Sequence, residues 1–377
     1  MTGRRRADGP MTVVFAPDSF KGSLSSVEVA RALAEGWGRA RPEDELLLAP
    51  LADGGEGTLA AIEAAGGWQR RYAAAHDPIG RPLTASWLIA DDGSHGALEL
   101  AEASGLSRLS AAERDPVGAS TAGTGEVIQA ALDAGVRRLL LGIGGSATTD
   151  GGAGIVSALG AQASRDDAAA VDLARLDRRL AETSLRIACD VSNPLLGPSG
   201  AAATYGPQKG ATATQVMDLD RRLAGWADRL EAATGRRERD TPGAGAAGGV
   251  GFALLCLRDR FRSLELVPGV DLVAEETGLD AKLGRADIVV TGEGRIDAQT
   301  AFGKTALGVA RRARAAGVRC IAVGGGVEPE GIAALAGLGA EVVPVHLEPI
   351  ALEDAIAAGT APLIACGERT ARSVGPR

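Results

Sequence analysis

The chain has 377 residues and a formal net charge of −8; 45% of its residues are hydrophobic and only 3% are aromatic. The length predicts one large or two medium domains, and the aliphatic composition favours helices layered on a β-sheet over an aromatic-rich β-sandwich. The negative charge argues against a nucleic-acid partner, and no apolar run reaches the roughly 18 residues of a membrane span. The four cysteines form no CxxC pair, so we expect a reducing, cytoplasmic location without disulfides or a zinc site.

The N-terminal part of the sequence predicts alternating strands and helices. Residues 1–10 carry an Arg triplet with no apolar stretch after it, so we expect a disordered extension, with Met11 as an alternative start. An S-x-x-E capping box from Ser25 to Glu28 predicts a helix that continues to about residue 39. Strands are expected at 12–16 and 46–49, and a further helix ends at residue 65. This βαβα alternation is typical of an α/β domain.

The middle of the chain has a less regular pattern. A turn-rich segment at 77–82 is flanked by short strands within 76–100. The charged segment 163–184 is expected to be a helical excursion, and the charged residues 236–240 are expected to be mobile. The other predicted elements are helices at 124–134 and 212–239 and strands at 138–143 and 185–188.

The C-terminal part has the clearest pattern. A buried strand is expected at 286–291, followed by a loop at 292–297. Gly317 is placed to end a helix that begins near residue 300. A strand at 318–323 then ends in three glycines, and another helix and strand continue to residue 345.

Five of the expected strands end in clusters of Gly, Asp, Glu or Lys. Ligands of open α/β sheets bind beyond the carboxyl ends of the strands, so a theme shared by five strand ends is better evidence than any one motif. The clusters are Asp18-Ser19-Phe20-Lys21-Gly22, Asp53-Gly54-Gly55-Glu56-Gly57-Thr58, Gly144 to Asp150, Asp190-Val191-Ser192-Asn193 and Gly292 to Asp297.

These clusters contain the residue types that phosphoryl transfer requires. Carboxylates can hold Mg²⁺, glycines let backbone N–H groups approach phosphate, and lysines can neutralise its charge. Only four of the 40 basic residues are lysine, and Lys21, Lys209 and Lys304 each adjoin a glycine. The clusters contain no histidine, which disfavours a histidine-based mechanism. The Walker A and dinucleotide-binding motifs are both incomplete in this sequence.

The stretch GIGGSATTDGGAG, which begins at Gly142, has two interpretations. It is either a plain strand-to-helix turn or a turn whose N–H groups and helix dipole hold a nucleotide phosphate. In the second case the candidate binding residues are Gly144, Gly145, Ser146, Thr148, Thr149 and Asp150. The carboxylates have structural alternatives too, because Asp53 can cap a helix and Asp190 can cap a turn.

Six motifs in order along the chain resemble the bacterial glycerate kinase family, type I. They are the segments 16–24, 50–58, 142–154, 189–195, 206–210 and 291–297, the last with Gly303 and Lys304 shortly after it. The resemblance implies a kinase that uses ATP and Mg²⁺ to phosphorylate D-glycerate, with 2-phosphoglycerate as the main expected product and 3-phosphoglycerate as the other. The departures from the family pattern are the N-terminal extension and the segment 163–184.

The resemblance also implies an α/β fold of two domains. We expect a Rossmann- or flavodoxin-like domain with a parallel sheet from residues 11–75 and 280–377, and an inserted α/β domain from residues 76–279. The active site would lie in the cleft between them. A homodimer is one possible assembly, and no nucleic-acid or membrane partner is expected.

The chemistry of phosphoryl transfer suggests roles for the candidate residues. A carboxylate should accept the proton of the glycerate hydroxyl, with Asp190 as the first choice and Asp297 as the second. Lys21 and Lys304 would neutralise the transferred group, and Glu293 and Asp53 could hold Mg²⁺. The other candidates are Asp18, Ser19, Asn193, Arg295 and Arg81 for the substrate, the arginines as donors to its carboxylate, and Gly54 and Gly55 for the nucleotide.

Three other functions remain open at this stage. A kinase for another short hydroxy acid or sugar acid would carry the same motifs. A GHMP-type kinase would explain Gly-Gly-Ser-Ala but would place that loop nearer the N-terminus. A non-enzymatic α/β ligand-binding regulator would not need so many carboxylates suited to magnesium.

Overall fold

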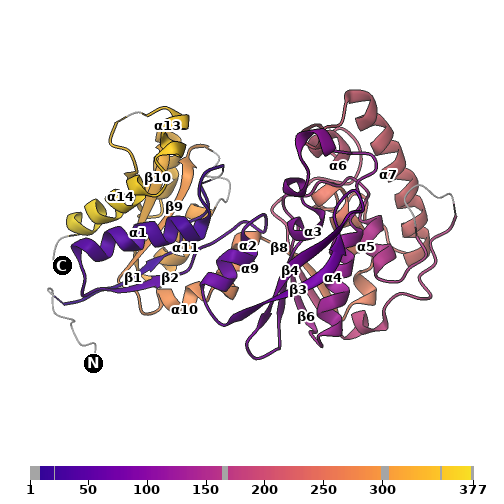
Figure 1. The fold of residues 1–377 in the computed structure, drawn as a ribbon, viewed down its shortest axis with the longest axis horizontal. Coiled ribbons are helices and arrows are strands. Elements are labelled where there is room, and N and C mark those ends of the chain that lie inside the picture. Colours follow the sequence, from indigo (N-terminus) through magenta and orange to yellow (C-terminus); the bar gives the residue numbers. More distant parts are fainter. Residues whose placement is uncertain (1–8, 21, 164–168, 299–304, 349, 375–377) are drawn as a thin grey trace. The chain divides into compact units, whose positions relative to one another are not determined.

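The computed structural model describes residues 9–20, 22–163, 169–298, 305–348 and 350–374. The chain forms two compact units (Figure 1). The first unit combines the chain up to Asp53, the segment Ala60–Gly66 and the chain from Val270 onward. The second unit combines Gly54–Leu59 with Gly67–Gly269. Among the described residues, no helix has both the length and the apolar character that a bilayer crossing requires.

The first unit is built on a parallel sheet with the strand order β11-β10-β9-β1-β2. Numbered along the chain, this is the doubly wound order 2-1-3-4-5, which is typical of flavodoxin-like folds. Val14 pairs with Leu47 of one neighbouring strand and with Val289 of the other. The strands are β1 (Thr12–Phe15), β2 (Glu45–Leu48), β9 (Ile288–Ile296), β10 (Arg319–Val327) and β11 (Glu341–Pro344).

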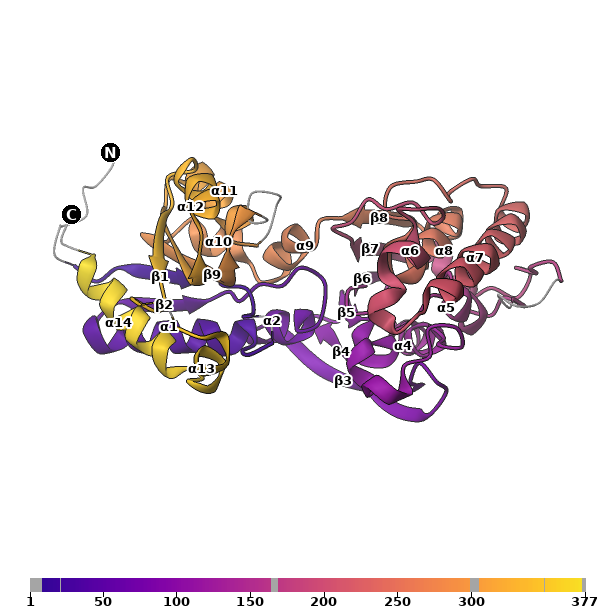
Figure 2. The ribbon, with the colours of Figure 1, turned by 90° about the horizontal axis from the view of Figure 1, so that it is seen from above.

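Helices cover both faces of this sheet (Figure 2). On one face, α1 (Ser26–Ala40) packs closely against α14 (Ala361–Ser373), because a Cβ added to Gly36 would lie 1.9 Å from the carbonyl oxygen of Ile364. Helix α11 (Thr305–Ala316) lies on the opposite face. The remaining helices are α9 (Gly269–Glu276), which begins at the last residue of the second unit, α10 (Leu279–Leu283), α12 (Pro329–Ala336) and α13 (Leu352–Ala357).

The second unit contains a mixed sheet with the order β3-β4-β5-β6-β7-β8. The pairs β3-β4 and β4-β5 are antiparallel, whereas β5 to β8 are parallel, so the carboxyl ends of β5 to β8 share one edge. The strands are β3 (Trp68–His76), β4 (Pro82–Ala90), β5 (Gly96–Glu99), β6 (Arg138–Gly142), β7 (Ser184–Ala188) and β8 (Ser263–Val267).

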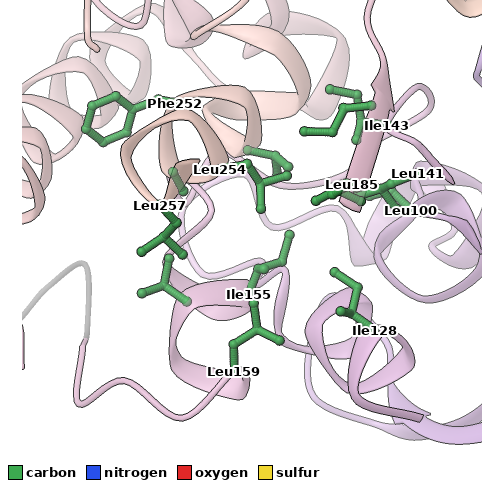
Figure 3. Packing of buried hydrophobic residues seen from close by; sticks show 14 of the residues in the cluster. Leu100, Ile128, Leu141, Ile143, Ile155, Leu159, Leu185, Phe252, Leu254 and Leu257 are labelled. Atoms are coloured by element: carbon green, nitrogen blue, oxygen red, sulfur yellow. The ribbon is translucent and has the colours of Figure 1, made fainter. Parts of the chain in front are cut away.

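The core of the second unit is aliphatic, as the composition predicts. Figure 3 shows Ile155 of α5 between Ile128 of α4 and Leu257 at the end of α8, and all three side chains are fully buried. The helices are α2 (Thr58–Ala64), which begins in this unit, α3 (Ala101–Ser104), α4 (Ala122–Asp133), α5 (Ala153–Ala158), α6 (Ala201–Tyr205), α7 (Ala213–Thr234) and α8 (Val250–Cys256). Short 3₁₀ segments lie at Leu106–Arg108, Ala111–Glu113, Arg178–Glu182, Pro207–Lys209, Ala246–Gly248 and Arg258–Arg260.

The structure corrects four local predictions. The expected loop at 292–297 is largely strand, because β9 continues to Ile296 and pairs with β10 as far as Val327. The three glycines expected to follow β10 lie within it. The described part of 163–184 contains a 3₁₀ segment and turns in place of an α-helix. Helix α7 ends at Thr234, before the expected end at residue 239, and its Glu231 accepts hydrogen bonds from the backbone N–H groups of Glu238 and Arg239. The expected mobility of residues 236–240 stays a prediction.

The expected domain limits after residues 75 and 279 differ from the limits of the compact units. Strand β3 pairs along its whole length with β4, so residues 68–75 belong to the second unit. The chain re-enters the first unit at Val270, before the expected limit. The expected cleft between domains stays a prediction.

Candidate functional site

The first unit has a topological switch point at the carboxyl ends of β1 and β9. The helices that follow these strands, α1 and α11, cover opposite faces of the sheet (Figure 2), which leaves a crevice for ligands in folds of this kind. The chain stays paired just beyond the strands, because the N–H of Asp18 donates to the carbonyl oxygen of Gly292 over 2.8 Å. The Thr291 hydroxyl donates to the carbonyl oxygen of Ala16 over 2.8 Å.

Three carboxylates lie in or beyond the carboxyl-terminal parts of neighbouring strands of this sheet. Asp18 is 8% exposed, and its carboxylate accepts hydrogen bonds from the N–H of Ser19 and the hydroxyl of Thr305, both over 2.6 Å. Glu293 is also buried, within β9. Asp53 follows β2, the other neighbour of β1, and is partly buried. The structure therefore places Asp18 and Asp53 after β1 and β2, and Glu293 in the carboxyl-terminal half of the adjacent strand β9.

This set of carboxylates fits a magnesium ion whose other ligands come from a nucleotide. Mg²⁺ is commonly held by one or two carboxylates together with water and substrate phosphates. Among the described residues, no group of three or more His, Cys, Asp or Glu side chains is gathered into a metal site.

The predicted charge-neutralising lysines cannot be placed. Lys21 and Lys304 both lie outside the described residues. Arg295, predicted to bind the substrate carboxylate, is 67% exposed at the side chain and forms ion pairs with Glu328 and Asp297.

In the second unit, the segment Gly54–Leu59 packs over the carboxyl ends of the parallel strands. The N–H of Gly144 donates to the carbonyl oxygen of Gly54 over 3.1 Å. Glycine is needed on both sides of this contact. A Cβ added to Gly144 would lie 2.5 Å from the Cα of Gly55, and one added to Gly54 would lie 2.3 Å from the Cβ of Ala188. The two glycine-rich motifs are therefore pressed together, backbone against backbone.

In the turn after β6, three backbone N–H groups have no acceptor among the residues that the structure describes. Several of its neighbours are paired: Ala147 donates to the carbonyl oxygen of Ser104, and Gly151 donates to that of Gly248. Within the described part of the chain, the N–H groups of Gly145, Ser146 and Thr148 have no hydrogen-bond acceptor. The Thr148 hydroxyl is also fully buried and has no partner among these residues. Unpaired N–H groups in a tight turn form the type of concavity that binds anions.

The helix after this turn, α5, is the one whose dipole was expected to favour a phosphate group. Helix α5 is short, and its first N–H groups are already bonded within the protein. The carboxylate of Asp150 accepts from the N–H groups of Gly152 and Gly154 over 3.0 and 3.1 Å, and from both the N–H and the hydroxyl of Thr121. Asp150 therefore holds the start of α5 and Thr121 in place, and its predicted contact with the nucleotide stays a prediction.

Lys209 lies behind the same turn. It is buried, and its ammonium group donates to the Ser146 hydroxyl over 2.9 Å and to the carbonyl oxygen of Thr148 over 2.5 Å. Burial lowers the pKa of Lys209 to about 7, although the nearby charge of Asp150 acts in the opposite direction.

Sequence reasoning missed Glu99, the last residue of β5. It is buried, and its carboxylate accepts hydrogen bonds from the N–H groups of Gly57 and Leu59 over 3.0 and 3.2 Å. Burial raises the pKa of Glu99 to about 7, although these two hydrogen bonds act to lower it. Glu99 therefore fixes the segment Gly54–Leu59 over the strand ends. A carboxylate interrupting the apolar run from Ala97 to Leu100 was the available signal.

The other predicted residues of the second unit are held by protein partners. Asp190 is exposed after β7, and one carboxylate oxygen accepts from the N–H of Gly269, the first residue of α9, over 2.8 Å. Asn193 bridges the carbonyl oxygen of Ser199 and the hydroxyl of Tyr205, which favours a role in shaping its loop over the predicted substrate contact.

Arg81 is similarly engaged by carboxylates. Its guanidinium donates to Asp77 over 2.5 Å and to Glu113 over 2.6 Å, and its side chain is 49% exposed. A substrate carboxylate would have to compete with these two groups.

Comparison with known proteins identifies relatives that match most of the chain. A model described as the glycerate kinase family matches residues 13–375. A glycerate kinase of Halalkalibacterium halodurans is 42% identical over 327 residues, which cover 83% of this chain and 85% of the relative. A glycerate 2-kinase of Escherichia coli K12 is 42% identical over 317 residues, which cover 81% and 82%.

A solved structure agrees with the whole fold. A crystal structure from Salmonella typhimurium LT2, described as a candidate glycerate kinase 2, matches with a TM-score of 0.83 and 38% identity. The match covers 97% of this chain and 98% of the other. Fold and matches together define an α/β phosphotransferase. The chain belongs to the glycerate kinase family.

Proposed function

We propose that the protein transfers the γ-phosphoryl group of ATP to a hydroxyl group of D-glycerate and forms 2-phosphoglycerate. Membership of a kinase family implies ATP as the donor. The name of the glycerate 2-kinase from Escherichia coli supports the 2-position. The structural observation that carries the proposal is the turn after β6, where three N–H groups and the Thr148 hydroxyl have no partner among the described residues.

In this proposal the turn binds the phosphates of the nucleotide. The N–H groups of Gly145, Ser146 and Thr148 would donate to phosphate oxygens, because buried or constrained donors without an acceptor are otherwise costly. Gly54 and Gly55 allow the neighbouring segment to approach the turn closely. Thr149 remains a candidate contact beside them.

The carboxylates of the first unit would serve the metal ion and the substrate. Glu293 and Asp53 would hold Mg²⁺, which when bound neutralises charge on the phosphates. Asp18, which orients Ser19 and Thr305, would position the substrate with Ser19. Lys21 and Lys304 are proposed to neutralise the transferred group on grounds of sequence alone.

Asp190 is the proposed general base. Its bond to the N–H of Gly269 orients the carboxylate at the end of β7. As the glycerate oxygen forms its bond to the γ-phosphorus, its proton passes to Asp190 and the bond to the bridging oxygen of ADP breaks, so atoms and charge balance. Asp297 is the second candidate, and Arg295 or Arg81 would bind the glycerate carboxylate after exchanging an acidic partner.

The test is a steady-state assay of ADP release by the purified full-length protein. D-glycerate should give the highest kcat/KM in a panel with L-glycerate, glycolate, lactate and sugar acids. Activity should disappear with excess EDTA and return with Mg²⁺. A higher kcat/KM for another acid would replace the proposed substrate. Activity that persists without a divalent ion would remove the proposed role of Glu293 and Asp53.

A further inference from the structure

Lys209 is a buried lysine without an acidic partner. It is 2% exposed, and among the described residues no carboxylate lies within hydrogen-bond or ion-pair distance of it. Lysine is almost never fully buried unless it is paired, because an ammonium group loses strong hydration when it leaves water. A lysine in this position therefore calls for an explanation beyond the packing of its side chain.

The local backbone directs this side chain inward. Lys209 ends the short segment Pro207–Lys209, which follows α6, and Gly210 terminates it with a φ of 97° that favours glycine. Gly206 lies so close to the carbonyl oxygen of Ala202 that an added Cβ would be 2.4 Å away. Gly206 and Gly210 therefore allow the chain to turn tightly at both ends of this segment. The ammonium group is thereby placed against Ser146 and Thr148 of the turn after β6.

Both hydrogen-bond partners of Lys209 belong to the turn with unpaired N–H groups. Its ammonium group donates to the Ser146 hydroxyl and to the carbonyl oxygen of Thr148. Ser146 and Thr148 are themselves two of the three residues whose N–H groups lack an acceptor in the described part of the chain. Lys209 thus fixes the oxygen atoms of the residues whose nitrogen atoms are left for a ligand.

The ammonium group of Lys209 has no carboxylate in direct contact among the described residues. Asp150 contributes a favourable field, but its oxygens are bonded to Thr121 and to the start of α5. Arg114 adds a further positive charge nearby, since its guanidinium donates to the carbonyl oxygen of Gln208 over 3.4 Å. An anion bound at the turn would add a second negative charge close to Lys209 and so favour its protonated form.

We propose that Lys209 is the positioning residue of the phosphate-binding turn and the buried cation that a bound nucleotide phosphate neutralises. It acts through Ser146 and Thr148 and is not itself a contact of the ligand, because its ammonium group is buried. The proposal rests on the proposed function, which places the phosphates of ATP at this turn. A purely structural tie between two loops would stabilise the fold without changing nucleotide affinity.

Two substitutions separate charge from hydrogen bonding. Lys209→Met keeps the length but removes both, whereas Lys209→Gln keeps a neutral donor. The matched control is Lys282→Met. Lys282 is partly buried, and burial is the main cause that lowers its pKa, as it is for Lys209. Its ammonium group donates to the carbonyl oxygens of Leu48 and Thr277, away from the turn.

The measurements are KM and kcat with ATP and glycerate varied separately, together with Tm. Lys209→Met should raise KM for ATP by about 10- to 100-fold, the range expected for lost hydrogen bonds from a charged group, with a smaller effect on KM for glycerate. Lys209→Gln should show a smaller increase. Lys282→Met should lower Tm and leave KM for ATP unchanged.

Titration calorimetry of ATP binding provides a second measurement. In buffers of different ionisation enthalpy at pH 8, wild-type protein should take up more protons on binding ATP than Lys209→Gln, because a bound anion returns the proton to Lys209.

The inference is overturned if both Lys209 variants keep the wild-type KM for ATP, or if proton uptake is the same in Lys209→Gln and wild type. The proposed function fails separately, when wild-type protein binds ATP in the calorimeter but phosphorylates none of the acids. In that case the affinity of the variants for ATP still tests the role of Lys209.

Discussion

Asp190 has a geometry that allows an unusually clean test of general-base catalysis. One oxygen of its carboxylate accepts a hydrogen bond from the N–H of Gly269, and an asparagine can preserve that acceptor. Asp190→Asn should therefore keep the fold while losing basicity, so kcat should fall by about 10²- to 10⁴-fold with little change in Tm. Steady-state kinetics of the purified variant provide the measurement.

Asp297→Asn is the matched comparison. Oδ2 of Asp297 lies 3.5 Å from Nε of Arg295, and the side chain of Asp297 is 17% exposed. Near-wild-type kcat in Asp190→Asn together with a large loss in Asp297→Asn would transfer the role of base to Asp297. Full activity in both variants would remove carboxylate assistance from the account.

At the scale of single residues, the sequence indicated which kinds of side chain lie in the glycine-rich loops better than it indicated what each side chain does there. A carboxylate or amide in a glycine-rich loop can face a ligand or cap its own backbone, and the sequence does not distinguish these uses. Asp150 and Asn193 were predicted to face ligands, yet both are bonded to protein groups. Glu99 was overlooked because its partners, Gly57 and Leu59, are distant along the chain.

At the scale of the elements, the contact between the Gly54–Leu59 segment and the turn after β6 leaves no room for a larger side chain at Gly144. Gly144→Ala would place a Cβ 2.5 Å from the Cα of Gly55, so the two segments would have to separate. We expect the free energy of unfolding to fall by about 1–3 kcal/mol, the usual effect of overpacking, and KM for ATP to rise. Chemical denaturation and steady-state kinetics measure the two effects.

Gly38→Ala is the control for this substitution. Gly38 lies inside α1, where an added Cβ would make only ordinary contact, 3.5 Å from the Cδ1 of Leu46. Alanine should stabilise that helix by about 0.5–1 kcal/mol and leave kinetics unchanged. Wild-type stability and KM in Gly144→Ala would show that the two glycine-rich segments do not need their close contact.

Specific local motifs, such as helix caps, predicted the starts of helices well. The capping box at Ser25 and Glu28 is present at the start of α1, and Thr212 caps α7 near the predicted start of the long helix. The predicted end of β9 at residue 291 was wrong, because Gly292 and Gly294 suggested a loop where the strand continues to Ile296. Glycine weakens a strand on its own, but pairing with β10 in a sheet covered on both faces overrides that preference.

For the whole molecule, the sequence predicted the α/β class and a parallel sheet but not the strand order. The order 2-1-3-4-5 depends on pairing between β1 and β9, which are separated by more than half of the chain. Periodicity reports which face of a strand is buried and carries no information about its neighbours. The switch point at Asp18 and Gly292 therefore emerged only from the structure.

The most direct test of the account is a phosphorus NMR spectrum of the reaction of wild-type protein with ATP, Mg²⁺ and D-glycerate. The account predicts that the γ-phosphate signal of ATP declines while signals of ADP and 2-phosphoglycerate rise in equal amounts. A 3-phosphoglycerate signal would correct the hydroxyl that is phosphorylated. An unchanged ATP spectrum, or the release of inorganic phosphate alone, would contradict phosphoryl transfer to glycerate.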